Sequence, residues 1–378
     1  MNQFPIFRIT LVIAVFVSII SFPLINSEVL IFNDIENTEN RKATDRPTFE
    51  PSRADHFPEA YDQYYNDQFP LRQRIVKTYN WVVFNIFKRS PLPNKVILGQ
   101  DGWLFMAGTE YDCFDGSDQL TEKEMSNIKK ELEYRKQYHE ARGRKYYFMV
   151  APVKANIYPE LLPEGSAQQS TMGTGESLVT YLNKESCINV INMYDVLRRN
   201  KHRGQLYYKL DNHWNQKGGL VAAEYILLVM NTDRPEVKTI RYSDFVQNDS
   251  STLTGNLENM LSNVGNTADS AIMLTPNNGF QSHESAKAGY PSPAKFPYTR
   301  DYENVRAKTG IHKPVLLIIS DSFGGNLFPF ISEGFGRSVK IFDAWQYKRN
   351  EDIIAKEKPD VVLVVVLESK LRLFGKKN

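Results

Sequence analysis

Residues 315–325, VLLIISDSFGG, carry the pattern that decides the fold. The first five are all apolar, and such a run is typical of a strand that is covered on both faces of a sheet. Further strands are predicted at 145–151, 188–192, 205–210, 339–342 and 361–367. Helix-length segments separate the last of these strands, which indicates β-α-β units. The sequence therefore predicts an α/β protein with a parallel sheet in a flavodoxin-like, three-layer α/β/α arrangement.

The strongest helix signal lies upstream, at residues 121–142. Thr121 and Glu124 form a capping box, because each side chain can bond a free backbone N–H of the first turn. Gly143 follows as a natural stop. An apolar, alanine-rich stretch at 218–230 predicts a second, buried helix.

The amino-terminal region predicts export of the chain. Residues 9–25 carry no charge and Arg8 precedes them, which favours a transmembrane signal anchor at 1–27 with its amino terminus in the cytoplasm. A cleaved signal peptide is the alternative, although no clear small-residue cleavage site follows the apolar run. Both interpretations place the remaining chain outside the cytoplasm, and the anchor would make it a single-pass membrane protein.

The remaining chain divides by composition. The predicted parts are a linker at 28–56 and a main domain at 57–378, which includes a helical preface at 57–93 and a loop-rich insertion at 246–312. The preface is rich in aromatic residues, and Pro70 divides it into two helices, near 57–66 and 70–88. A turn signal between two apolar runs predicts a hairpin at 95–105.

Charge and cysteine content exclude several classes of protein. The chain has 46 Lys and Arg against 44 Asp and Glu, a formal net charge of +2, so no nucleic-acid partner is expected. Cys113 and Cys187 form no C-x-x-C pair and the six histidines have no metal-binding spacing, so neither a cofactor nor a metal site is predicted. After export the two cysteines could form a disulfide, and two free thiols are the alternative.

Ser322 is the candidate nucleophile. It follows the strand at 315–320, and open α/β sheets bind ligands at the carboxyl ends of their strands. Gly324 and Gly325 open a helix, whose free N–H groups are suited to an oxyanion hole. A serine needs a base to act as a nucleophile, and His213 can supply it while Asp211 fixes the imidazole tautomer.

Several motifs, in order along the chain, resemble those of the AlgJ/AlgX-like (DHHW) family of SGNH hydrolase-fold proteins. They are YNDQFPLR at 65–72, ILGQDGWLF at 97–105, PVK at 152–154 with YP at 158–159, DNHW at 211–214, DSF at 321–323 and PDVV at 359–362. Residue 320 is serine where the family usually has glycine. The resemblance implies an SGNH hydrolase-like domain that follows the anchor and the helical preface.

The resemblance also implies an activity: transfer of an acetyl group to a polysaccharide hydroxyl through an acyl-Ser322 intermediate. His213 would be the general base and Asp211 the acid that orients it. The backbone N–H of Ser322, with Gly324 or Gly325, would hold the oxyanion. The implied partners are a polysaccharide acceptor and a membrane-bound acetyl-donating protein of the MBOAT type.

Three further side chains are weaker candidates for the site. Asn326 could donate to the oxyanion, with a helix cap or a surface position as the alternative. Lys154 could hold an anionic sugar or the acetyl donor, with a solvated lysine as the alternative. Trp214 could stack on a sugar ring, with core packing beside His213 as the alternative.

Two other functions fit the same residues. A carbohydrate acetylesterase would use the same triad with water in place of the sugar hydroxyl. A non-catalytic scaffold of a polysaccharide-modification complex would leave the triad idle, and it would form no covalent adduct at Ser322.

Overall fold

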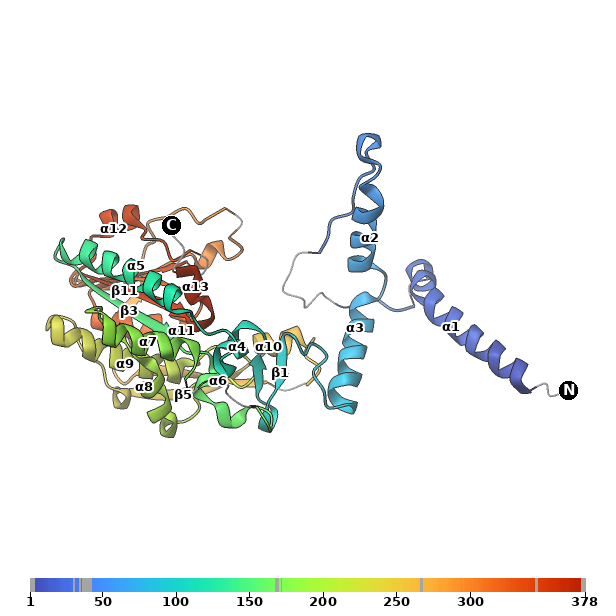
Figure 1. The fold of residues 1–378 in the computed structure, drawn as a ribbon, viewed down its shortest axis with the longest axis horizontal. Coiled ribbons are helices and arrows are strands. Elements are labelled where there is room, and N and C mark those ends of the chain that lie inside the picture. Colours follow the sequence, from blue (N-terminus) through green and yellow to red (C-terminus); the bar gives the residue numbers. More distant parts are fainter. Residues whose placement is uncertain are drawn as a thin grey trace. The chain divides into compact units, whose positions relative to one another are not determined.

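The computed structural model of the chain describes residues 4–29, 31–33, 35, 43–166, 170, 172–265, 268–294, 296–343 and 346–374. These residues form two compact units. Unit 1 comprises Met1–Pro93 and Glu258–Asn266, and unit 2 comprises Asn94–Leu257 and Thr267–Asn378. Figure 1 shows the helices and strands of both units, and each unit is described by itself.

Unit 1 is helical. Its helices are α1 (Phe4–Val29), α2 (Phe57–Gln68), α3 (Arg72–Trp81) and a π-helical turn (Val82–Ile86). The two helices predicted around Pro70 are thus confirmed. The segment 258–266 belongs to this unit because Asn80 Nδ2 donates to Ser262 Oγ (3.0 Å) and Asn85 Nδ2 donates to the Val264 carbonyl (3.0 Å).

The membrane anchor predicted at 1–27 is not shown. Residues 9–25 all lie in the helix α1. Across the described ranges, however, none of the helices combines the length and the apolar character that a membrane span requires.

Unit 2 is built on a mostly parallel sheet. Its order is β4-β3-β11-β9-β10-β8-β7, and only the two pairings of β8, with β10 and with β7, are antiparallel. The bounds are β3 (Lys145–Ala151), β4 (Val190–Ile191), β7 (Ser282–Glu284), β8 (Glu303–Lys308), β9 (Val315–Ser320), β10 (Arg337–Phe342) and β11 (Val361–Leu367). The parallel sheet predicted from the apolar runs is confirmed, with β9 near its centre.

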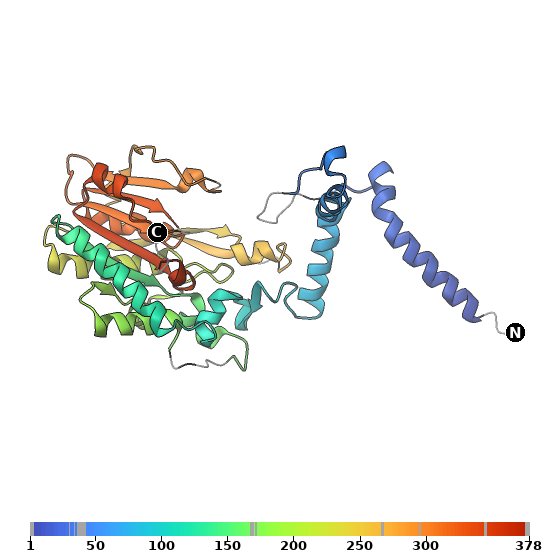
Figure 2. The ribbon, with the colours of Figure 1, turned by 45° about the horizontal axis from the view of Figure 1, so that its top comes forward.

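Helices cover both faces of this sheet, as Figure 2 shows. Successive side chains of a strand point to opposite faces, so Met149 and Phe148 of β3 lie in different core clusters. One cluster packs against α8 (Met193–Arg199), α9 (Gln216–Asp233) and α11 (Gly324–Ile331), and the other against α5 (Glu122–Glu140), α7 (Thr174–Glu185) and α12 (Glu351–Glu357). The predicted three-layer arrangement is confirmed, and so is the capping box at Thr121.

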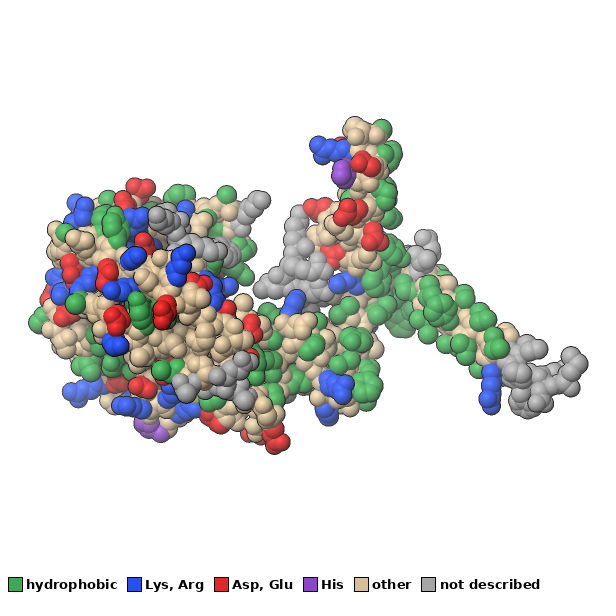
Figure 3. Space-filling view, in the orientation of Figure 1, with side chains coloured by type: hydrophobic (Ala, Val, Ile, Leu, Met, Phe, Trp, Pro, Cys, Tyr) green, Lys and Arg blue, Asp and Glu red, His purple; other side chains and the backbone are tan. Residues whose placement is uncertain are grey.

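The rest of unit 2 is made of short elements. They are the hairpin β1 (Val96–Leu98) and β2 (Leu104–Met106), the hairpin β5 (Phe245–Leu253) and β6 (Asp269–Pro276), and the helices α4 (Thr109–Asp115), α6 (Lys154–Ile157) and α13 (Leu371–Phe374). The helix α10 (Asn256–Met260) begins in unit 2, and its last three residues belong to unit 1. Cys113 and Cys187 are both free thiols. Figure 3 shows basic and acidic side chains intermixed over the visible face of unit 2, as the near-zero net charge suggests.

Two predictions of secondary structure were wrong. Residues 246–312 hold most of β5 and all of β6, β7 and β8, so the insertion has far more regular structure than its polar composition indicates. Residues 205–210 form no strand. Only Tyr207 makes a ladder pairing there, an isolated bridge to Trp214, because the chain turns back on itself before it can join the sheet.

Candidate active site

Ser322 lies in a short turn at the carboxyl end of β9. The strand ends at Ser320 and α11 begins at Gly324, so the sheet and the helix fix both ends of the turn. The Ser322 residue is exposed, whereas its neighbours Asp321 and Phe323 are buried. The hydroxyl therefore faces solvent on a backbone that the core holds in place.

The carboxylate of Asp321 fixes this turn through three hydrogen bonds. Its Oδ1 accepts the N–H of Phe323 (2.9 Å), and its Oδ2 accepts the hydroxyl of Tyr347 (2.7 Å) and the N–H of Leu367 (2.6 Å). Burial raises the pKa of Asp321 above its ordinary value, although these bonds act in the opposite direction. The carboxyl group thus joins the end of β9 to the end of β11.

Ser322, His213 and Asp211 form one chain of hydrogen bonds. His213 Nε2 lies 2.7 Å from Ser322 Oγ, and His213 Nδ1 lies 2.6 Å from Asp211 Oδ1. A carboxylate can only accept, so the Nδ1 of the neutral ring carries the proton and Nε2 is free to accept from the serine hydroxyl. The structure brings together the three side chains that the sequence predicted.

The electrostatics of the pair favour proton transfer to His213. Burial lowers the pKa of His213, but the hydrogen bond and the charge of Asp211 outweigh burial and raise it above 6.5. Burial raises the pKa of Asp211, but the bond and the charge of His213, with N–H donors from Asn256 (2.9 Å) and His213 (2.9 Å), lower it overall. An ionised Asp211 beside the ring stabilises the imidazolium that forms when a base takes a proton.

The segment 206–215, here called the strap, carries Asp211 and His213. The strap is held from outside the sheet: Asp269 Oδ2 accepts the N–H of Leu210 (2.8 Å), and the N–H of Leu257 donates to the Leu210 carbonyl (3.2 Å). Gly255 allows this approach, since a Cβ there would lie 2.0 Å from the Leu210 carbonyl oxygen. Contacts from distant parts of the sequence thus replace a strand ladder.

Lys154 is a part of the strap's support, not a surface binding group. It is 1 % exposed, and its Nζ donates to the carbonyls of Tyr208 (3.1 Å), Lys209 (3.3 Å) and Asp211 (2.7 Å). Burial lowers the pKa of Lys154 to about 7, although nearby carboxylates raise it. Both the predicted role in holding an anion and the alternative of a solvated lysine are wrong, because the ammonium is enclosed by backbone oxygens.

Glu110 is a site neighbour that sequence reasoning missed. Its Oε1 accepts from Asn212 Nδ2 (2.6 Å), and the Asn212 carbonyl oxygen Oδ1 accepts from Asn256 Nδ2 (2.6 Å). Burial raises the pKa of Glu110 to about 7, against the opposing effects of Asn212, His213 and Lys154. The polar segment around residue 110 carried no motif, so only the long-range packing of α4 reveals this carboxyl group beside the triad.

Trp214 and Asn326 connect the strap to the serine turn. Trp214 is fully buried, and its Nε1 donates to the Phe323 carbonyl (2.9 Å), so core packing is correct and stacking on a sugar ring is excluded. Asn326 Nδ2 donates to the Trp214 carbonyl (2.7 Å), which uses one of its two N–H groups, and its role at an oxyanion stays a prediction.

The backbone N–H groups of Gly324 and Gly325, predicted for an oxyanion hole, are both hydrogen-bonded in this structure. The N–H of Gly324 donates to the Asp321 carbonyl (3.1 Å), and the N–H of Gly325 donates to the Ser322 carbonyl (2.9 Å). Both N–H groups are therefore used by the turn itself.

Within the described part of the chain, no cluster of three or more His, Cys, Asp or Glu is placed to hold a metal ion.

Comparison with known proteins agrees with this architecture. The family described as "SGNH hydrolase-like domain, acetyltransferase AlgX" matches residues 96–281. The probable alginate O-acetylases AlgJ of Pseudomonas putida and Pseudomonas aeruginosa are 23 % and 25 % identical over 168 and 170 residues, 44 % of this chain in each case. These alignments cover 41 % and 40 % of the relatives, so the chain spans only about two fifths of their length.

A solved structure also shares the fold. Bacillus cereus PatB1 with a sulfonyl adduct has a TM-score of 0.55 at 18 % identity, covering 74 % of this chain and all of that chain. The resemblance that the motifs predicted is confirmed.

Proposed function

We propose that this chain, whose residues 96–281 match the SGNH hydrolase-like domain of the acetyltransferase AlgX, transfers acetyl groups to a hydroxyl of a cell-surface or secreted polysaccharide. The observation that carries the proposal is the unbroken hydrogen-bond chain from the exposed Ser322 through His213 to the ionised Asp211. The curated relatives are named as probable alginate O-acetylases, which supports a polysaccharide as the acceptor.

The proposed reaction has two steps. Ser322 Oγ attacks the acetyl carbonyl carbon of the donor while His213 Nε2 takes the hydroxyl proton, and the bond from acetyl to the donor breaks as His213 returns that proton to the leaving group. The sugar hydroxyl then attacks acetyl-Ser322, again giving its proton to His213, which passes it to Ser322 Oγ. In this proposal the backbone N–H of Ser322 donates to the oxyanion of each tetrahedral intermediate.

The donor and the location are proposals of the same kind. Acetyl-CoA is not expected outside the cytoplasm, so an exported enzyme would receive its acetyl groups from a membrane-bound acetyl-donating protein of the MBOAT type. We propose that the enzyme works on the periplasmic side of the inner membrane.

An acetylesterase is the second candidate, and the exposure of Ser322 favours it because water can reach an acyl group there. One experiment separates the two. The full chain and its Ser322→Ala variant are incubated with 4-nitrophenyl acetate, and their intact masses are measured. An acetyl group on the wild type alone supports the proposed nucleophile.

The fate of that acetyl group then decides the activity. Its transfer to an added polysaccharide supports the transferase, and equal loss with and without polysaccharide supports the esterase. If neither 4-nitrophenyl acetate nor a sulfonyl fluoride labels a folded wild type, both enzymatic proposals fail and a non-catalytic scaffold remains.

A further inference from the structure

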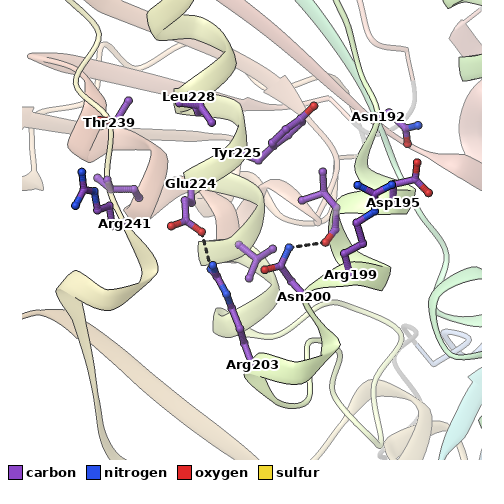
Figure 4. A pocket seen from close by; sticks show the side chains of 13 residues that line it. Asn192, Asp195, Arg199, Asn200, Arg203, Glu224, Tyr225, Leu228, Thr239 and Arg241 are labelled. Atoms are coloured by element: carbon purple, nitrogen blue, oxygen red, sulfur yellow. Dashed lines mark hydrogen bonds and ion pairs between the residues drawn. The ribbon is translucent and has the colours of Figure 1, made fainter.

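A pocket of about 590 Å³ lies in unit 2, apart from the triad. Its walls come from α8, α9 and the segment 239–241, as Figure 4 shows. Ligand sites in proteins usually enclose about 300–1,000 Å³, so one or two sugar rings fit this size. None of the triad residues lines it.

Arginines outnumber carboxylates in the pocket lining, with Arg199, Arg203 and Arg241 against Asp195 and Glu224. Arg203 Nη1 lies 2.6 Å from Glu224 Oε2, and Arg198, behind the pocket, makes a bidentate pair with Glu176 (2.7 and 2.8 Å). In the ranges that the structure describes, neither Arg199 nor Arg241 has a carboxylate within ion-pair distance, although both line the pocket. Figure 4 shows them on opposite sides of α9.

The lining between the two arginines suits a sugar. Tyr225 and Leu228 of α9 present an aromatic ring and an aliphatic group, and the C–H faces of sugar rings pack on such surfaces. Asp195 of α8 contributes a carboxylate to the lining, and Asn200 follows the helix with its Nδ2 donating to the Val196 carbonyl (2.7 Å). The side-chain oxygens of both residues can accept bonds from sugar hydroxyls. A guanidinium matches a carboxylate in shape and charge, so each free arginine can take an acidic substituent.

We propose that this pocket binds acidic sugar units of the acceptor polysaccharide at a distance from Ser322. The proposal rests on the proposed function, because it assumes a polysaccharide acceptor. Helix α9 begins three residues after His213, and Tyr225 lies nine residues beyond its start, about 14 Å along the axis. A polymer longer than this separation can occupy the pocket and the triad together, and binding at the pocket raises its effective concentration at Ser322.

Binding of an oligomannuronate to the full chain by isothermal titration calorimetry tests the proposal. The variants are the double substitution Arg199→Ala with Arg241→Ala, and Arg300→Ala as a control that removes an exposed arginine outside the pocket. A cello-oligosaccharide of equal length serves as the neutral ligand, and inorganic phosphate as the small anion. Loss of two charge-assisted contacts predicts an affinity for the oligomannuronate at least about tenfold weaker in the double variant, with Arg300→Ala unchanged.

The results separate this inference from the proposed function. Equal affinity of the wild type and the double variant, an equal loss with Arg300→Ala, or equal binding of the neutral oligosaccharide would each overturn the acidic-sugar site. Phosphate that binds as tightly as the oligomannuronate would reduce the pocket to an anion site and also overturn it. Acetylation of Ser322 by 4-nitrophenyl acetate does not involve the pocket, so its absence would count against the proposed function and leave the binding result standing.

Discussion

Ser322 and His213 lie one hydrogen bond apart, but the segments that carry them are held in different ways. The serine turn continues a strand whose six residues are all buried, and it enters a helix directly. The strap has no ladder beyond the bridge from Tyr207 to Trp214. Its shape depends on side chains from other parts of the chain, Lys154 and Asp269 among them.

This difference separates two ways to damage the site. The position of Ser322 is set by the backbone of the core. A substitution that shifts the serine turn should therefore lower the stability of the protein along with its activity. The position of His213 is set by buried polar contacts, so changes far away in sequence should misplace the base while the sheet stays intact. The four predictions below test that division, from the largest expected effect to the smallest.

Asp211→Asn should lower the rate of acetyl transfer by about 10⁴-fold, because an amide donates to Nδ1 and holds His213 in the wrong tautomer. The amide Oδ1 can still accept the N–H that Asn256 now donates to the carboxylate, so the fold should persist. Steady-state kinetics with a chromogenic acetyl ester measure the rate, and circular dichroism checks the fold. A rate within tenfold of the wild type would remove Asp211 from the triad.

Lys154→Met tests the support of the strap and leaves the three triad side chains unchanged. The substitution keeps the length of the side chain but removes the ammonium donor from three carbonyls. The Lys209 carbonyl keeps the N–H of Leu104 (3.0 Å), so the loss falls on the carbonyls of Tyr208 and Asp211, each at a cost of about 1–3 kcal/mol, partly offset because a buried charge disappears. We expect kcat to fall by roughly 10²-fold through displacement of Asp211, with a smaller change in KM. Kinetics and a denaturant titration measure both effects, and unchanged kcat in a folded variant would contradict the support role.

The same division explains what the sequence could and could not predict. A short, continuous apolar run such as 315–319 is typical of a buried strand. The local sequence therefore predicts β9, the turn that follows it and the place of Ser322 in that turn. Residues 205–210, which lead into the strap and form its first half, also resemble a strand, but long-range bonds to Lys154 and Asp269 decide their path. Glu110 carries no local signal at all, since only burial beside Asn212 gives it a role.

Glu110→Gln tests the buried carboxyl group through pH. The pKa of Glu110 is raised to about 7 in the folded protein, from an unfolded value near 4.5. The folded state then binds more protons than the unfolded state between these values, so wild-type stability falls as pH rises from about 4.5 to 7. The glutamine keeps an acceptor for Asn212 but does not titrate, so it should remove on the order of 2 kcal/mol of that fall.

Denaturant titrations of the wild type and Glu110→Gln at several pH values measure this slope. Lys154, whose pKa is lowered to about 7, affects stability mainly above pH 7, where the unfolded state binds more protons, so its window does not overlap. If the free energies of unfolding of the two proteins change in parallel between pH 4.5 and 7, the pKa of Glu110 is not raised in the folded state.

The smallest effect tests the serine turn with a matched pair of glycines. A Cβ on Gly324 would lie 2.1 Å from Ser320 Oγ and 2.8 Å from its Cβ, whereas a Cβ on Gly325 meets nothing within 4 Å. Ser320 is fully buried and cannot move aside freely. Gly324→Ala should therefore cost about 1–2 kcal/mol of stability through overpacking, and Gly325→Ala should stay within about 0.5 kcal/mol of the wild type.

The acylation rate sharpens this last comparison. Because the turn and the strand are one packed unit, the loss of stability in Gly324→Ala should come with slower acylation of Ser322, while Gly325→Ala keeps both. Thermal unfolding and the intact-mass time course with 4-nitrophenyl acetate measure the two quantities side by side. Equal behaviour of the two variants would mean that the turn adapts independently of the core, and that the serine is held no more firmly by the backbone than the histidine is by its side-chain contacts.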